Sequence, residues 1–148
     1  MGEFTLKKYL ISGLIFLLAG IIIILGAFML FDNENSKNIK FLKSYGWEVE
    51  KKPVEQAEIN IPAVFDDIYE NYNILQAEAG LDLSPYAGMK AKRYTYILKN
   101  FPYDTDEQVR ANVITVNKEP VAGDIMTVSL GGFMYSLNFN EAVCFAIK

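Results

Sequence analysis

An uncharged run of 22 residues, positions 10–31, constrains the N-terminal part of this chain more than any other feature. A helix of that length reaches roughly 33 Å at about 1.5 Å per residue, slightly more than the hydrocarbon core of a bilayer. The run is longer than the apolar core of a signal peptide, and it ends in large residues where a peptidase requires small ones. The sequence therefore predicts an uncleaved transmembrane helix at residues 10–31, after a cytoplasmic tail of residues 1–9.

The charges that flank this run predict an orientation. Lys7 and Lys8 precede the run, whereas Asp32 and Glu34 follow it, and this asymmetry places the N-terminus inside the cell. The opposite orientation stays open, because three more lysines follow within the same window: Lys37, Lys40 and Lys43. The immediate flanks favour a single-pass protein of a bacterial cell membrane, with residues 32–148 as an extracytoplasmic domain.

Six small residues in the run fall into adjacent pairs spaced by seven positions. They are Ser12, Gly13, Ala19, Gly20, Gly26 and Ala27. A step of seven residues drifts by only about 20° around an α-helix, so the pairs share one stripe on which a second helix can pack closely. We expect this stripe to mediate self-association or binding to another membrane protein, with chance alignment as the alternative.

The remaining residues, 32–148, suffice for one domain with its own core. Apolar residues at helical spacing predict a main helix from Phe65 to Ala79, ended by Gly80. Alternation with a period of two predicts three strands, at residues 93–99, 109–117 and 121–130. The predicted fold class is therefore α+β: an N-terminal transmembrane helix followed by a small domain with an antiparallel sheet packed against one main helix.

Weaker signals surround these elements. A short helix ended by Gly46 is expected before residue 46, and alternation predicts short strands at residues 47–50 and 57–61. Residues 133–148 are too apolar to remain in solvent, but their pattern favours neither helix nor strand.

The residue inventory excludes many catalytic and binding classes. The chain has no histidine, which removes Ser-His and Cys-His catalysis and histidine-containing zinc sites. A net charge of −4 argues against binding nucleic acid. No cofactor, metal or catalytic residue is predicted. Glycoside hydrolysis by carboxylates alone stays open, although Asp66, Asp67 and Glu70 lie opposite the apolar face of their helix.

Aromatic and charged residues of the domain are the best candidates for a ligand or partner surface. They are Trp47, Tyr86, Arg93, Tyr94, Tyr96 and Asp124. Amphipathic rings are common at binding surfaces, but the strand face shared by Tyr94 and Tyr96 can equally pack on the helix. Arg93 and Asp124 either pair across the sheet or face a ligand, and the sequence leaves both arrangements open.

Several short motifs together resemble a known domain family. They are Tyr45-Gly46-Trp47-Glu48-Val49, Tyr72-Asn73-Ile74-Leu75-Gln76, Gly80-Leu81-Asp82-Leu83, Arg93-Tyr94-Thr95-Tyr96, Arg110-Ala111-Asn112-Val113 and Gly123-Asp124. The chain is similar over residues 36–135 to an uncharacterised, membrane-anchored family of clostridia and relatives whose function is unknown. The resemblance implies domain limits and location but no chemistry. Asn117-Lys118-Glu119-Pro120 departs from the Asn-Gly turn typical of the family. A looser, fold-level similarity links the domain to PepSY-type modules of bacterial envelopes.

These observations favour a non-catalytic, membrane-anchored extracytoplasmic module for interaction, sensing or regulation. Its expected partners are the membrane, an envelope protein or a cell-wall ligand. The alternatives are an envelope hydrolase that uses carboxylates alone and a small accessory subunit of a membrane complex.

Overall fold

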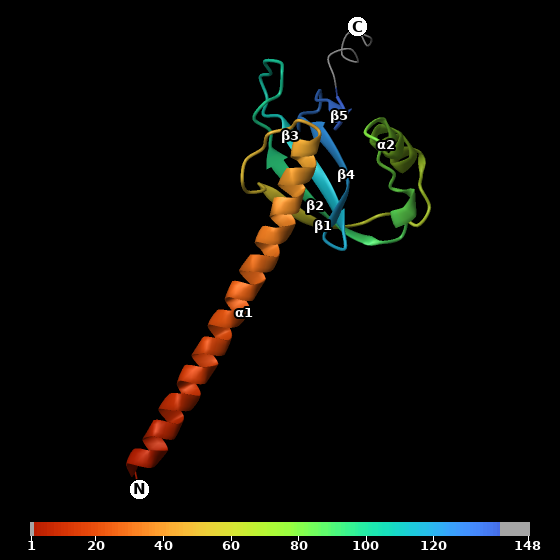
Figure 1. The fold of residues 1–148 in the computed structure, drawn as a ribbon. Coiled ribbons are helices and arrows are strands. Elements are labelled where there is room, and N and C mark those ends of the chain that lie inside the picture. The colour runs from red at the N-terminus through yellow and green to blue at the C-terminus, as the bar shows by residue number, and fades with distance from the viewer. Residues whose placement is uncertain (1, 140–148) are drawn as a thin grey trace. The chain divides into compact units, whose positions relative to one another are not determined.

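The computed structural model describes residues 2–139, and within the first helix it leaves the side chains of residues 2–8, 10 and 27–33 undescribed. The chain divides into two compact units, Met1–Glu34 and Asn35–Lys148, and every contact given below lies within the second unit. The elements are α1 (Gly2–Ser44), β1 (Glu55–Asn60), α2 (Asp67–Glu78), the 3₁₀ turn η1 (Ser84–Tyr86), β2 (Lys90–Ile97), β3 (Arg110–Val116), β4 (Glu119–Met126) and β5 (Met134–Ser136) (Figure 1).

Helix α1 contains the apolar run as part of a longer element. It begins at Gly2 and ends at Ser44, followed by Gly46 in the left-handed region at φ +89°. Among the helices and side chains that the structure describes, none is both long enough and apolar enough to cross a membrane. This finding contradicts the transmembrane helix predicted at residues 10–31. Composition marked an apolar run, whereas the helix extends past both of its ends and includes the separate short helix expected before residue 46.

The domain is α+β with a five-stranded antiparallel sheet in the order β1-β2-β3-β4-β5. β2, β3 and β4 correspond to the three predicted strands, and β1 corresponds to the strand predicted at residues 57–61. The strand predicted at residues 47–50 is reduced to one bridge, between Val49 and Leu98. β5 falls in the segment for which the sequence favoured no element, and residues 140–148 of that segment lie outside the described part of the chain.

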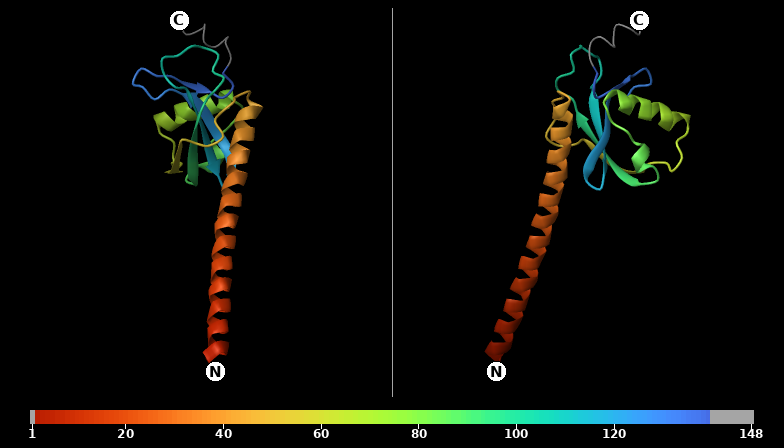
Figure 2. Two further views of the ribbon diagram at one scale, coloured as in Figure 1. Left: turned by 90° about the vertical axis from the view of Figure 1, so that its left-hand side faces the viewer. Right: turned by 45° about the vertical axis from the view of Figure 1, so that its right-hand side comes forward.

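Two helices cover opposite faces of the sheet (Figure 2). Leu42, near the end of α1, belongs to the core cluster of one face with Tyr94 and Val113, and this is called the α1 face. Ile114 belongs to the cluster of the other face, against which Tyr72 of α2 packs, and this is called the α2 face. The expectation of one main helix was incomplete. Apolar side chains lie on both faces of the sheet, and each face therefore requires its own cover.

Local signals account for both ends of α2 (Figure 1). The Asp66 side chain caps the first turn by accepting a hydrogen bond from the Tyr69 backbone N–H at 2.9 Å, and Gly80 follows the helix at φ +73°. Gln76 is the fully buried residue of the helix, and its Oε1 accepts a bond from the Gly123 backbone N–H at 2.9 Å. This bond ties α2 to β4 beyond the end of the short strand β5.

A register shift in the β3–β4 hairpin determines which side chains of β4 reach the α2 face. Ile114 pairs with Ala122, but Thr115 pairs with Pro120, so Val121 is an extra residue without a partner on β3. Such a bulge reverses the side-chain alternation beyond it. Asp124 consequently pairs with Asn112 and shares its face.

The hairpin turn itself offers a test of local geometry. Asn117 and Lys118 lie between β3 and β4 with φ values of 51° and 66°, the pattern of a type I′ turn. Asparagine tolerates this region, whereas lysine is strained there. Lys118→Gly is expected to raise the free energy of unfolding by about 0.5–1 kcal/mol in urea titrations. Lys52→Gly, at an exposed position without positive φ, is the comparison, and an equal gain there would contradict the turn assignment.

Candidate functional site

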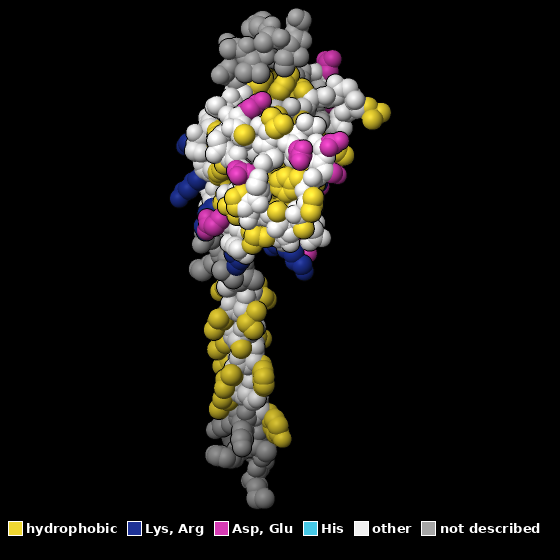
Figure 3. Space-filling model, turned by 90° about the vertical axis from the view of Figure 1, so that its right-hand side faces the viewer, with side chains coloured by type: hydrophobic (Ala, Val, Ile, Leu, Met, Phe, Trp, Pro, Cys, Tyr) yellow, Lys and Arg dark blue, Asp and Glu magenta, His cyan; other side chains and the backbone are white. Residues whose placement is uncertain are grey.

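A cavity of about 570 Å³ lies between α2 and the sheet. Its lining consists mainly of apolar side chains, with a few polar groups from α2 and the central strands. The lining residues are Ile59, Ile68, Tyr69, Asn71, Tyr72, Leu75, Arg93, Asn112, Ile114, Asp124, Met126 and Met134. On this side of the domain, hydrophobic and acidic side chains are intermixed at the surface (Figure 3).

The strand register places a row of polar residues across the α2 face. Glu55 pairs with Thr95, Thr95 with Asn112, Asn112 with Asp124, and Asp124 with Ser136. All five strands contribute one member. The central members, Thr95, Asn112 and Asp124, are buried, so their polar atoms need partners inside the protein.

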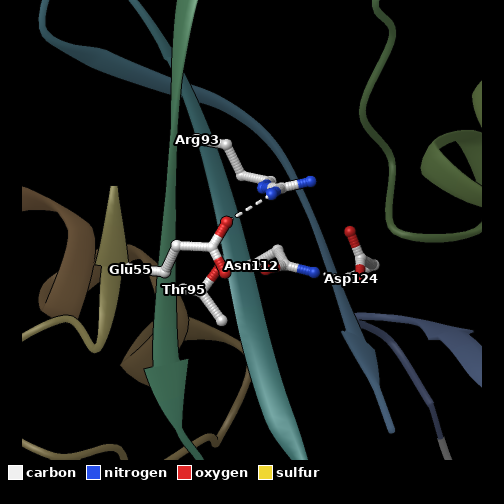
Figure 4. Close-up of polar contacts among 5 residues, drawn as sticks. All are labelled: Glu55, Arg93, Thr95, Asn112 and Asp124. Carbon is white, nitrogen blue, oxygen red and sulfur yellow. Dashed lines mark hydrogen bonds and ion pairs between the residues drawn. The ribbon is translucent and has the colours of Figure 1, made fainter. Parts of the chain in front are cut away.

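Hydrogen bonds connect the centre of this row (Figure 4). The Thr95 hydroxyl donates to Asn112 Oδ1 at 2.7 Å, and Asn112 Nδ2 donates to Asp124 Oδ1 at 2.9 Å. The Tyr72 hydroxyl donates to Asp124 Oδ2 at 2.8 Å. Both carboxylate oxygens of Asp124 are thus engaged, one by the sheet and one by α2. This arrangement fixes the tyrosine of α2 to the floor of the cavity.

Burial governs the ionisation of the Tyr72–Asp124 pair. Loss of water raises the pKa of Asp124 above its ordinary 3.8, while the bonds from Asn112 and Tyr72 and the positive charge of Arg93 oppose this rise. Burial, followed by the nearby carboxylate, raises the pKa of Tyr72 well above 10.0. Tyr72 therefore remains a hydrogen-bond donor across the neutral range.

Arg93 is the cationic residue of the lining. Its Nη2 donates to Glu55 Oε1 at 2.7 Å (Figure 4). Its Nε atom is buried, and no residue in the described part of the chain accepts a bond from it. Arg93 does not bond directly to Asp124. Of the two arrangements that the sequence left open, the direct pair is therefore not formed, and both residues line one cavity.

The buried carboxyl predicts a specific pH dependence. Between pH 3.8 and its raised pKa, Asp124 keeps its proton in the native state but loses it in the unfolded state. Its contribution to stability is therefore full below pH 3.8 and is lost as the pH rises through the native pKa. Asp124→Asn should gain stability relative to the wild type as the pH increases from about 4 to 7, measured by urea unfolding at several pH values.

Asp82 is a control, because its contribution to stability should depend on pH in the opposite direction. Hydrogen bonds from Ser84 and Asn73 lower the pKa of this exposed carboxyl below 3.8. Its contribution is present above pH 3.8 and is lost as the pH falls, so Asp82→Asn should lose relative stability as the pH rises over its titration range. A flat or falling difference for Asp124→Asn would contradict the buried-carboxyl assignment.

The structure divides the ligand-surface residues predicted from the sequence between the two faces. Arg93 and Asp124 line the cavity. Trp47, Tyr94 and Tyr96 are buried in the α1-face core, where Trp47 Nε1 donates to the Leu137 carbonyl at 2.7 Å and the Tyr96 hydroxyl donates to Asn35 Oδ1 at 2.9 Å. Tyr86, in η1, packs against the α2-face core. The aromatic residues therefore do not form one exposed platform.

The small residues predicted to form a helix-packing stripe lie in α1. A Cβ atom added at Gly13, Gly20 or Gly26 would meet no atom within 4 Å. The side chain of Ala27 lies outside the described part of the chain. The stripe stays a prediction.

Three residues of the polar network, Thr95, Asn112 and Tyr72, were missed as site residues. Asn112 stands between Ala111 and Val113 in β3, and this polar residue among buried apolar neighbours signals a buried hydrogen-bond network. Tyr72 lies on the apolar face of α2, and its spacing could not distinguish a core ring from a donor to Asp124. Among the side chains that the structure describes, no group of three or more acidic, cysteine or histidine residues could hold a metal.

A family model for a domain of unknown function, DUF4830, matches residues 41–125, which is more than half of the chain. The chain belongs to the DUF4830 family. This confirms the resemblance to an uncharacterised domain family, and the match includes most of the cavity lining of this DUF4830 domain. No curated protein and no solved structure gives a significant match. The similarity to PepSY-type modules has no support from these comparisons.

Proposed function

We propose that this DUF4830 domain is a non-catalytic binding module for interaction, sensing or regulation, and that its ligand occupies the cavity between α2 and the sheet. The observation that carries this proposal is the cavity itself. Its volume of about 570 Å³ falls within the roughly 300–1,000 Å³ typical of small-molecule sites. Such sites combine an apolar lining with a few polar groups in fixed positions, as this one does.

The polar groups of the cavity support binding over chemistry. A fixed hydrogen-bond network, Thr95–Asn112–Asp124–Tyr72, holds the polar part of the lining in one geometry. Preorganised groups reduce the entropy lost when a ligand binds. In the same network, each oxygen of Asp124 already accepts one hydrogen bond from the protein.

The alternative, hydrolysis by carboxylates alone, requires two acidic side chains facing one substrate bond. Asp124 is the one carboxylate among the described residues that line this cavity. Glu55, the other carboxylate of the polar row, lies outside the lining and bonds to Arg93. No observation favours the hydrolase, and the predicted envelope location and wall or protein partner stay predictions from the sequence.

Methyl NMR of the full chain tests the proposal. Isotope labels on isoleucine and methionine methyl groups place five probes in the cavity: Ile59, Ile68, Ile114, Met126 and Met134. Titration with a library of small amphipathic fragments is expected to shift these signals and to leave Ile125, buried on the α1 face, unchanged.

Two variants separate cavity binding from general adhesion to apolar surface. Ile59→Phe introduces bulk into the lining and should abolish the fragment-induced shifts. Val54→Phe, at a half-exposed position outside the lining, should preserve them. If no fragment shifts the cavity methyls, or if Ile59→Phe leaves the shifts intact, the proposed function is wrong.

A further inference from the structure

Arg93 is the cationic group of the cavity, and part of its bonding capacity is unused. Its guanidinium carries five N–H donors in a rigid fork, and the buried Nε has no acceptor among the described residues. By contrast, both carboxylate oxygens of Asp124 already accept hydrogen bonds. A ligand that enters the cavity and displaces Glu55 therefore gains a cationic group with a spare donor, whereas the acidic group is already bonded within the protein.

The present partner of Arg93 is replaceable. Glu55 accepts from Nη2 alone, and the side chains of the two residues are 41% and 48% exposed. Half-exposed ion pairs of this kind contribute little to stability, because water competes for both groups. The side-on edge of the guanidinium, formed by Nε and Nη2, suits both oxygens of one carboxylate.

The rest of the lining indicates the chemistry of the other part of the ligand, beyond the anionic group that would bind Arg93. Ile59, Ile114 and Met126 are apolar and lie in the same cavity as Arg93. A compact, multiply charged anion such as phosphate would leave this surface without contact and would face one arginine only. A singly charged group with an apolar chain matches both parts of the cavity.

Building on the proposed function, we propose that the cavity binds a small amphipathic carboxylate, with its carboxylate on Nε and Nη2 of Arg93 and its apolar chain along Ile59, Ile114 and Met126. Glu55 acts as an internal competitor that occupies Nη2 when no ligand is present. On binding, the single bond from Arg93 to Glu55 is exchanged for a bidentate interaction with the ligand carboxylate, which also supplies the missing acceptor for Nε. The resulting preference is for carboxylates over alcohols and amines of equal chain length.

Three eight-carbon probes test this preference on the full chain: octanoate, 1-octanol and octylamine. Methyl NMR titration should give octanoate an affinity at least about 10-fold higher than 1-octanol, as expected for a charge-assisted bidentate pair. Octylamine should bind more weakly than the alcohol. The shifted signals should be the cavity methyls of Ile59, Ile114 and Met126.

Charge variants identify the group responsible. Arg93→Gln should reduce octanoate affinity by roughly 10-fold while leaving 1-octanol affinity unchanged. Glu55→Gln should increase octanoate affinity several-fold by removing the competitor. Lys92→Gln, at the neighbouring exposed position outside the lining, should change neither affinity. If Arg93→Gln does not fold, Arg93→Lys, which keeps the charge but loses the fork, should show an intermediate loss.

The outcomes distinguish this inference from the proposed function. Equal affinity for octanoate and 1-octanol in the cavity would overturn the carboxylate preference while the binding module stands. An octanoate affinity that Arg93→Gln and Arg93→Lys leave unchanged would overturn it too, as would shifts confined to methyls of α1. Failure of every probe and fragment to reach the cavity would instead overturn the proposed function.

Discussion

Replacing Trp47 with alanine is expected to lower the free energy of unfolding of the domain by about 3–5 kcal/mol. Trp47 is 7% exposed and belongs to the α1-face core with Leu42 and Tyr94. The substitution removes the large ring from this core and leaves the Leu137 carbonyl without the donor that now lies 2.7 Å away. Urea unfolding followed by near-ultraviolet circular dichroism of the nine tyrosines measures the change.

Trp47→Phe separates the two contributions. Phenylalanine keeps much of the ring packing but cannot donate to Leu137, so this variant should lose only about 1–2 kcal/mol. A loss below about 1 kcal/mol for Trp47→Ala would show that the α1-face core does not depend on the indole.

Gly123→Ala is expected to destabilise the domain by about 3 kcal/mol, because added bulk in a packed sheet forces the backbone to shift. A Cβ atom at this position would lie 2.7 Å from the Asn112 carbonyl oxygen and 2.8 Å from Leu137 Cδ1. The first of these neighbours is backbone of the paired strand β3 and cannot rotate away. The same shift would disturb the bond from the Gly123 N–H to Gln76, and with it the attachment of α2.

Gly131→Ala is the matched control for this substitution. A Cβ atom at Gly131 meets nothing within 4 Å, and the backbone there lies outside the left-handed region. The control should change the free energy of unfolding by less than about 0.5 kcal/mol. Similar losses for the two glycine variants would refute the close approach of β3 to Gly123.

Elements with strong local signals were predicted well. The helical spacing around Tyr72 and the stop at Gly80 located α2, and the alternation of β-branched residues located β2, β3 and β4. The apolar run at residues 10–31 misled the prediction of the first helix, since composition marks apolar side chains but does not locate the ends of α1.

The candidate site depends on the strand register and on which helix covers which face of the sheet, and no local sequence pattern contains this information. Alternation showed that Tyr94 and Tyr96 share a face, but it could not show that α1, and not α2, covers that face. A two-residue turn after β3 without the bulge would align Asn112 with Gly123 and turn Asp124 to the α1 face. Arg93 and Asp124 lie on one face only because Val121 adds a residue to β4.

The bulge at Val121 determines which side chain of β4 lies opposite Asn112. A relative with a hairpin of the same length but regular pairing would place a glycine there, and its acidic side chain would point away from the tyrosine of α2. A relative that lacks only the extra residue would keep the acidic side chain opposite the asparagine. Members of the DUF4830 family can therefore lose one residue here and keep the polar network, but they cannot lose the bulge at constant length.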